Sequence, residues 1–174
     1  QLNFSKESVD RAGYIGIGNE TYPFKGTLNT YVNGMVCTIT KPMCNYVSTG
    51  ASFEGFNFNA NGAKAAISEY LVTADASAST KVNLKKIVVG GTIGSASTQA
   101  AGGLFAYVEN KTTAPIELEF GENASDSSYS VKMTAKVNGI YAGGMVGMVN
   151  SDVASTGPVQ ITSKISTVAG TVTG

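Results

Sequence analysis

The chain has 174 residues, of which 43% are hydrophobic and only 14% are charged, and its formal net charge is zero. This length and apolar content suffice for a folded core, which excludes a disordered polypeptide. Zero net charge argues against nucleic acid and against electrostatic docking on anionic membranes. No apolar run reaches the roughly 20 residues that would cross a bilayer, so we expect no membrane insertion.

Residue types that usually serve catalysis are scarce. The sequence has no His, no Trp and a single Arg, Arg11. Without His, the chain lacks the usual proton carrier near neutral pH, the base of Ser-His and Cys-His mechanisms, and a common zinc ligand. We therefore expect a non-catalytic protein with no cofactor.

Residues 1–30 are predicted to form an N-terminal capping segment over the first turn of the array that follows. Three tyrosines, Tyr14, Tyr22 and Tyr31, lie before or at that first turn. An aromatic ring with a polar tip suits an exposed contact surface. We expect these residues to form a patch for sugar or protein, although packing within the cap is the simpler alternative.

Two cysteines, Cys37 and Cys44, lie seven residues apart. A hairpin would bring them within reach of each other, and a secreted protein would permit a disulfide. Cysteine is also a good small core residue. We favour two buried free thiols and keep the disulfide as the alternative.

Residues 31–174 contain one short pattern four times: a small residue, an apolar residue, two variable positions, Tyr or Met, and an apolar residue. The second positions of the copies are Met43, Ile67, Leu104 and Met145, which are 24, 37 and 41 residues apart. We predict a β-strand at each copy. The second copy has an alternative, because residues 63–71 contain good helix formers.

Apolar and polar residues alternate in a second set of segments, which predicts strands with one buried face and one solvent-exposed face. These segments are 53–58, 82–89, 116–120, 131–134 and 159–162.

The pattern predicts an all-β fold, namely a parallel β-helix (β-solenoid) with irregular loops between its turns. One turn cannot bury its own apolar face, whereas stacked turns align similar residues into a continuous core. Small residues such as Gly102 and Gly143 would allow tight corners or close backbone approach. The alternative is a β-sandwich, which also has short strands at regular spacing. We expect residues 31–174 to be part of a longer array, since the last segment stops where another element is due.

Two segments, Ala101-Gly102-Gly103-Leu104-Phe105 and Ala142-Gly143-Gly144-Met145-Val146, resemble the GLUG motif, whose core is Gly-Gly-Leu-Val-Gly. The segment 22–28 resembles a Pro-Phe-x-Gly-Thr phrase at the start of such arrays. With the more divergent copies, the resemblance covers about residues 20–174. It implies a β-helical segment of a secreted or wall-attached bacterial protein, such as an adhesin or a surface peptidase. It implies a scaffold, so no catalytic residues carry over.

Acidic residues offer two further candidate sites. Glu117 and Glu119 alternate with apolar neighbours, so both should point outward, about 6.6–6.8 Å apart at their Cα atoms. That spacing overlaps the carboxyl separation of inverting glycosidases, but a flat outward pair is more typical of a solvent-exposed strand face. Glu122 and Asp126 could add a weak calcium site, for which an acidic polar loop is the alternative.

The sequence therefore predicts a structural or adhesive module that displays loops on a rigid β-solenoid at a cell surface or outside the cell. Its expected partners are a polysaccharide, a host surface protein and flanking domains of the same longer chain. Alternatives are a carbohydrate-binding module, or a non-catalytic segment of a surface peptidase or of a polysaccharide-active enzyme.

Overall fold

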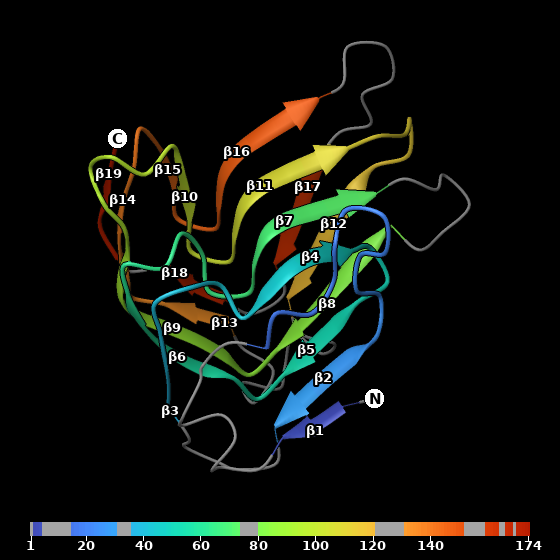
Figure 1. Ribbon diagram of the computed structural model, residues 1–174, viewed down its shortest axis with the longest axis horizontal. Helices are drawn as coiled ribbons and strands as arrows, with labels where there is room; N and C mark the ends of the chain where they lie inside the picture. Colours follow the sequence, from blue (N-terminus) through green and yellow to red (C-terminus); the bar gives the residue numbers. More distant parts are fainter. Residues whose placement is uncertain are drawn as a thin grey trace.

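The computed structural model is all-β, which confirms the predicted fold class (Figure 1). The described part of the chain contains strands and no helix. The structure describes residues 2–4, 15–30, 36–73, 80–120, 131–151, 159–163, 166–168 and 170–174.

The strands form four sheets, and every pairing between the described strands is parallel. The six-stranded sheet contains β1 (Leu2–Phe4), β2 (Thr27–Thr30), β5 (Ser52–Glu54), β8 (Lys81–Lys85), β12 (Ile116–Phe120) and β17 (Val159–Ser163). The four-stranded sheet contains β4 (Cys44–Ser48), β7 (Ser68–Thr73), β11 (Phe105–Asn110) and β16 (Val146–Ser151). The seven-stranded sheet contains β3 (Val36–Ile39), β6 (Asn57–Asn61), β9 (Ile87–Gly94), β13 (Val131–Met133), β14 (Lys136–Asn138), β18 (Ser166–Val168) and β19 (Val172–Thr173). The two-stranded sheet contains β10 (Ala100–Gly102) and β15 (Tyr141–Gly143).

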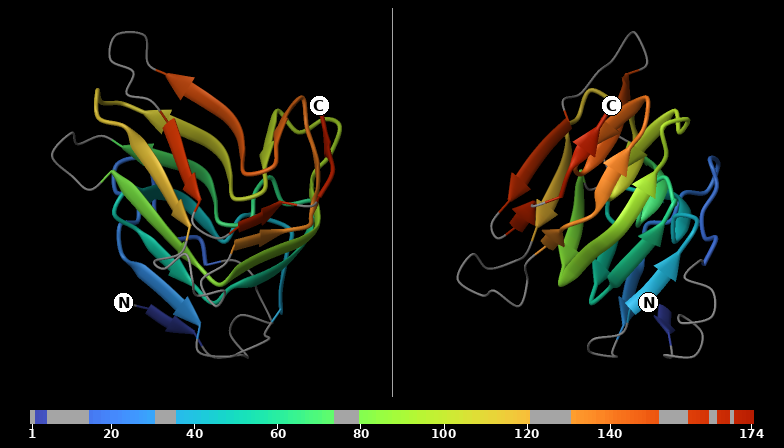
Figure 2. Two further views of the ribbon diagram at one scale, coloured as in Figure 1. Left: turned by 180° about the vertical axis from the view of Figure 1, so that it is seen from behind. Right: turned by 90° about the vertical axis from the view of Figure 1, so that its left-hand side faces the viewer.

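The chain visits the sheets in a repeating order. Strands β2, β3 and β4 lie in the six-, seven- and four-stranded sheets, and β5, β6 and β7 follow in the same order. Each later strand pairs beside the strand from the preceding pass, so segments far apart in sequence lie side by side. The colours accordingly follow the order of the sequence across each sheet, for example from cyan to orange across the four-stranded sheet (Figure 2).

The four copies of the sequence pattern pair with one another in register. Tyr46 lies opposite Tyr70, Tyr70 opposite Tyr107, and Tyr107 opposite Met148. The second copy forms β7, so the strand prediction is confirmed there and the helical alternative is wrong. In parallel sheets this register places similar side chains in columns that run across the strands.

The core consists of such columns. In the four-stranded sheet, Val47, Leu71 and Val108 are register partners and are all fully buried. In the six-stranded sheet, Leu28, Phe53 and Leu84 form an equivalent buried column. Each such side chain contributes about 1.5–3 kcal/mol through burial. One hydrophobic cluster joins residues from all three large sheets, so these sheets enclose a shared interior.

Two of the alternating segments differ from the prediction, because each turns a corner. Segment 53–58 divides between β5 and β6, and segment 82–89 divides between β8 and β9. Gly55 and Lys86 occupy the two corners and have positive φ angles of 85° and 51°. The left-handed backbone turns the chain from one sheet to the next, and glycine adopts it without steric penalty whereas lysine does not.

Cys37 and Cys44 are both buried and form no disulfide, so the favoured prediction is confirmed and the disulfide alternative is wrong. Cys37 lies on β3 and Cys44 on β4, and both belong to the hydrophobic cluster. Burial raises the pKa of the Cys44 thiol to about 12. A protonated, enclosed thiol fills space and does not act as a nucleophile.

Residues 15–24 lie along the edge of β4 that faces away from β7. The backbone N–H of Asn45 donates to the Ile17 carbonyl at 3.0 Å, and that of Ser48 donates to the Phe24 carbonyl at 2.9 Å. In return, the N–H of Phe24 donates to the Tyr46 carbonyl at 3.0 Å. These bonds satisfy polar groups that an edge strand would otherwise expose.

Candidate functional site

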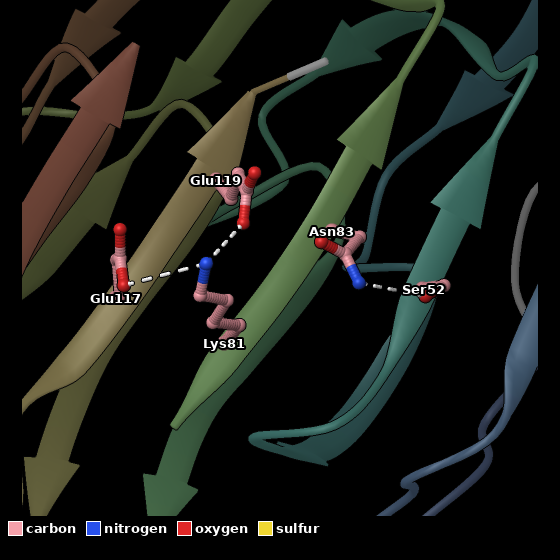
Figure 3. Close-up of polar contacts among 5 residues, drawn as sticks. All are labelled: Ser52, Lys81, Asn83, Glu117 and Glu119. Atoms are coloured by element: carbon pink, nitrogen blue, oxygen red, sulfur yellow. Dashed lines mark hydrogen bonds and ion pairs between the residues drawn. The ribbon is translucent and has the colours of Figure 1, made fainter. Parts of the chain in front are cut away.

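The outer face of the six-stranded sheet carries a cluster of charged residues on adjacent strands. Glu117 and Glu119 project outward from β12, as predicted, while Leu118 between them is fully buried. Lys81 of β8 lies between the two carboxylates (Figure 3). Its Nζ is 2.8 Å from Glu119 Oε2 and 3.9 Å from Glu117 Oε2.

This arrangement does not resemble a glycosidase pair. The hydrogen bond to Glu119 raises the pKa of Lys81, and the charges of Glu119 and Glu117 raise it further, so Lys81 stays cationic. The ammonium group occupies the space between the carboxylates that an attacking water or a glycosidic oxygen would need. Nearby, the Asn83 side chain donates to Ser52 Oγ at 3.4 Å, which extends a polar face of hydrogen-bonded neighbours (Figure 3).

The outer face of the four-stranded sheet carries a stack of tyrosine rings. The ring centroids of Tyr46 and Tyr70 are 4.5 Å apart, those of Tyr70 and Tyr107 are 5.1 Å apart, and the interplanar angles are 10° and 13°. Burial, followed by the charge of Glu69, raises the pKa of Tyr70 to about 12. The ring faces lie against one another, so the stack supports strand packing and leaves no free face on Tyr70 for a ligand.

A pocket of about 400 Å³ lies between the carboxyl ends of β4 and β7 and the N-terminal segment that runs along the edge of β4. Tyr22 lines this pocket and is 77% exposed. Lys111 Nζ lies 3.7 Å from Glu20 Oε1 at its rim. The remaining lining residues are Thr21, Pro23, Lys25, Ser48 and Val72.

Local hydrogen bonds fix the turn that presents Tyr22. The Tyr22 N–H donates to Asn19 Oδ1 at 2.8 Å, and the Asn19 N–H donates to the Tyr22 carbonyl at 3.1 Å. An Asn side chain that bonds to the backbone a few residues on is a common turn device. Two residues later, the Phe24 ring packs against Phe53 of the core at a centroid distance of 6.2 Å.

A second concavity, of about 340 Å³, lies near the amino ends of β4 and β7. Lys64 and Glu69 line it and form an ion pair at 2.8 Å. The other lining residues are Thr40, Lys41, Pro42, Asn45, Gly62 and Thr98. None of these side chains is aromatic, so this concavity offers hydrogen bonds without a flat apolar platform.

Of the five ligand residues predicted from the sequence, Tyr22 is the one that lies among the described residues, and it lines the pocket of about 400 Å³. Tyr14, Tyr31, Glu122 and Asp126 lie outside the described residues, so the aromatic patch and the calcium site stay predictions. Among the residues that are described, no group of three Cys, Asp or Glu side chains is arranged to hold a metal ion. Within the same residues, no helix has the length and apolar character needed to cross a membrane.

The sequence gives no direct indication of the residues that join Tyr22 in the pocket. Ser48, Val72 and Lys111 reach it from three different strand ends, and no local sequence pattern links them. The register of the pattern copies was the only available signal, because it aligns the carboxyl ends of β4, β7 and β11.

No family model, no curated protein and no solved structure matches this chain.

Proposed function

We propose that the chain coils as a parallel β-solenoid, in which each pass through the three large sheets is one turn. The parallel pairing of successive passes supports this architecture. A β-sandwich, the alternative, is built from antiparallel sheets with hairpin and Greek-key connections. In this proposal residues 15–24 act as the cap, which their bonds to the β4 edge support, whereas β1 and β2 within the predicted capping segment 1–30 pair as strands of the six-stranded sheet.

We also propose that the array is related to GLUG-motif repeats. The glycine pairs that carry the resemblance lie side by side, since Gly102 is the register partner of Gly143. A Cβ at either position would overlap a backbone carbonyl oxygen, of Phe105 and Val146 respectively. The motif glycines are thus required by a tight corner, which is a physical reason for the same residues to recur in successive turns.

The proposed function is that of a non-catalytic structural or adhesive module of a secreted or cell-surface bacterial protein. One observation carries this proposal: columns of similar residues stay in register while the chain length between them changes. Tyr46, Tyr70, Tyr107 and Met148 are register partners although they are 24, 37 and 41 residues apart. A scaffold that tolerates connections of different length can present different loops on one rigid frame.

Carbohydrate binding is the second candidate function, and the pocket beside Tyr22 favours it. A polysaccharide-active enzyme is less well supported, because Lys81 lies between the outward carboxylates of β12.

The test is retention of the purified chain on immobilised extracellular-matrix proteins and polysaccharides, with and without calcium. The heat-unfolded chain serves as the control for nonspecific adhesion. Saturable retention by the folded chain alone would support an adhesive module. A calcium requirement would support the predicted calcium site at Glu122 and Asp126. Retention on none of the surfaces would refute the adhesive function.

A further inference from the structure

We infer that the pocket formed by Tyr22, Glu20, Lys25 and Lys111 binds a saccharide unit of a glycan. This inference rests on the proposed adhesive function and assigns it a site and a ligand class. It combines three properties of the pocket: an exposed tyrosine, a preformed turn, and a rim that carries both positive and negative charges.

The first property is the exposure of Tyr22. Tyr22 as a whole residue is 77% exposed, whereas Tyr46, Tyr70 and Tyr107 are partly buried and use their ring faces for stacking. A sugar ring presents a face of C–H bonds and a rim of hydroxyl groups. It therefore suits an aromatic side chain whose face is free and whose surroundings are polar.

The second property is the rigidity of the turn. The reciprocal bonds between Asn19 and Tyr22 close the turn on one side of the ring. On the other side, Phe24 pairs with Val47 through a β-bridge and packs on Phe53. A ring held on a preformed turn loses little conformational freedom on binding. This lowers the entropic cost of binding, which matters most for ligands such as sugars that bind with low affinity.

The third property is the polar rim. The carboxylate of Glu20 accepts hydrogen bonds, and the ammonium groups of Lys25 and Lys111 donate them. Glu20 and Lys111 already lie 3.7 Å apart, so sugar hydroxyls can bridge the two charges without burying either one unpaired.

The composition of the pocket favours a glycan over a protein partner. Five of its eight lining residues are polar or charged: Glu20, Thr21, Lys25, Ser48 and Lys111. Protein interfaces obtain most of their affinity from desolvated apolar pockets. A volume of about 400 Å³ lies at the lower end of the range for small-ligand sites, which suits an individual saccharide unit rather than an extended chain.

The experiment measures binding of the whole chain to immobilised neutral and uronic-acid oligosaccharides by biolayer interferometry. We expect one of the two classes to be retained. Tyr22→Ala should weaken that binding roughly tenfold, the loss of an aromatic contact, while Tyr22→Phe should keep most of it. Tyr141→Ala is the matched control, because Tyr141 is an exposed tyrosine of β15 that does not line the pocket, and it should bind as the parent chain does.

Failure of this site is distinguishable from failure of the adhesive function. Retention on matrix proteins that is unchanged in Tyr22→Ala, with no oligosaccharide retained, would overturn the saccharide site and leave the adhesive function standing. Oligosaccharide binding that Tyr22→Ala does not weaken would also overturn the site. Far-UV circular dichroism of each variant confirms that it is folded, which the exposure of Tyr22 leads us to expect.

Discussion

Replacing Gly102 with alanine should destabilise the fold far more than the same change at Gly90. Both glycines belong to strands, and neither has a left-handed backbone, so the comparison isolates the space around each Cα. A Cβ at Gly102 would overlap the carbonyl oxygen of Phe105 and come 2.5 Å from the backbone nitrogen of Gly147. At Gly90 the nearest atoms would be Thr134 Oγ1 at 3.6 Å and the Phe58 carbonyl oxygen at 3.8 Å.

The magnitude follows from these distances. Nonbonded carbon contacts are comfortable at about 3.5–4.0 Å, so the backbone facing Gly102 must move by about 1 Å or more. Overpacking of a dense interior costs about 1–3 kcal/mol, and we expect about 3 kcal/mol because the obstructing atoms are backbone, which cannot rotate away. Gly90→Ala meets only ordinary contacts and should change stability by less than about 1 kcal/mol.

Urea unfolding followed by far-UV circular dichroism provides the assay. With an m value of about 2 kcal/mol per molar, Gly102→Ala should lower the midpoint by about 1.5 M. Gly143→Ala should act in the same direction, since its Cβ would overlap the Val146 carbonyl oxygen at the equivalent corner. Equal midpoints for Gly102→Ala and the parent chain, or equal losses for Gly102→Ala and Gly90→Ala, would refute the steric argument.

Four further predictions concern the ring stack, the pH dependence of its stability, the two thiols and a corner. Tyr70→Ala removes two ring contacts and should cost about 2 kcal/mol in urea unfolding, whereas Tyr70→Phe should cost less than about 0.5 kcal/mol. The pKa of Tyr70 is about 12 in the folded chain and about 10 when unfolded, so the unfolded state ionises first as the pH rises. The free energy of unfolding should therefore fall between about pH 10 and pH 12. The same decline in Tyr70→Phe, which cannot ionise at this position, would contradict this. Cys37 and Cys44 should react with a thiol reagent only in denaturant, and rapid labelling of the folded chain would disprove their burial. At the corner with φ of 51°, Lys86→Val should destabilise by about 1–2 kcal/mol and Lys86→Gly should not, as measured by thermal unfolding; equal stabilities would rule out backbone strain there.

The sequence predicted most of the strands because burial imposes a period of two on a strand with one face in the core. Residues 116–120 illustrate this, since their alternation indicated both the strand β12 and the outward direction of Glu117 and Glu119. The stacking of Tyr46, Tyr70 and Tyr107 was also predictable, because copies of one pattern that pair in register bring identical positions together.

The corners and the candidate sites were not predictable in the same way. Lys86 adopts a left-handed backbone although lysine has no preference for it. Its corner lies beside the corner at Gly55, and the Gly55 N–H donates to the Lys85 carbonyl, so pairing between the two corners imposes this backbone. The position of Lys81 between two glutamates depends on the register of β8 against β12, in which Lys81 lies opposite Glu117 and which no local sequence pattern indicates. Tertiary pairing, rather than local preference, decides both features.

One column of the four-stranded sheet shows what a neighbouring layer contributes. Val47, Leu71 and Val108 are fully buried, whereas their register partner Val149, on β16, is 52% exposed. The residue type hardly changes along this column, but among the described strands β16 pairs on one side only, with β11, and this accounts for the difference in exposure. Each strand is therefore stabilised largely by the strands beside it. The Gly102→Ala substitution should consequently also destabilise β16, which pairs with β11. Hydrogen exchange would detect this as lost protection in β11 and β16 of Gly102→Ala while β2 and β5 stay protected, and uniform loss across all strands would show that the stack unfolds as a single cooperative unit instead.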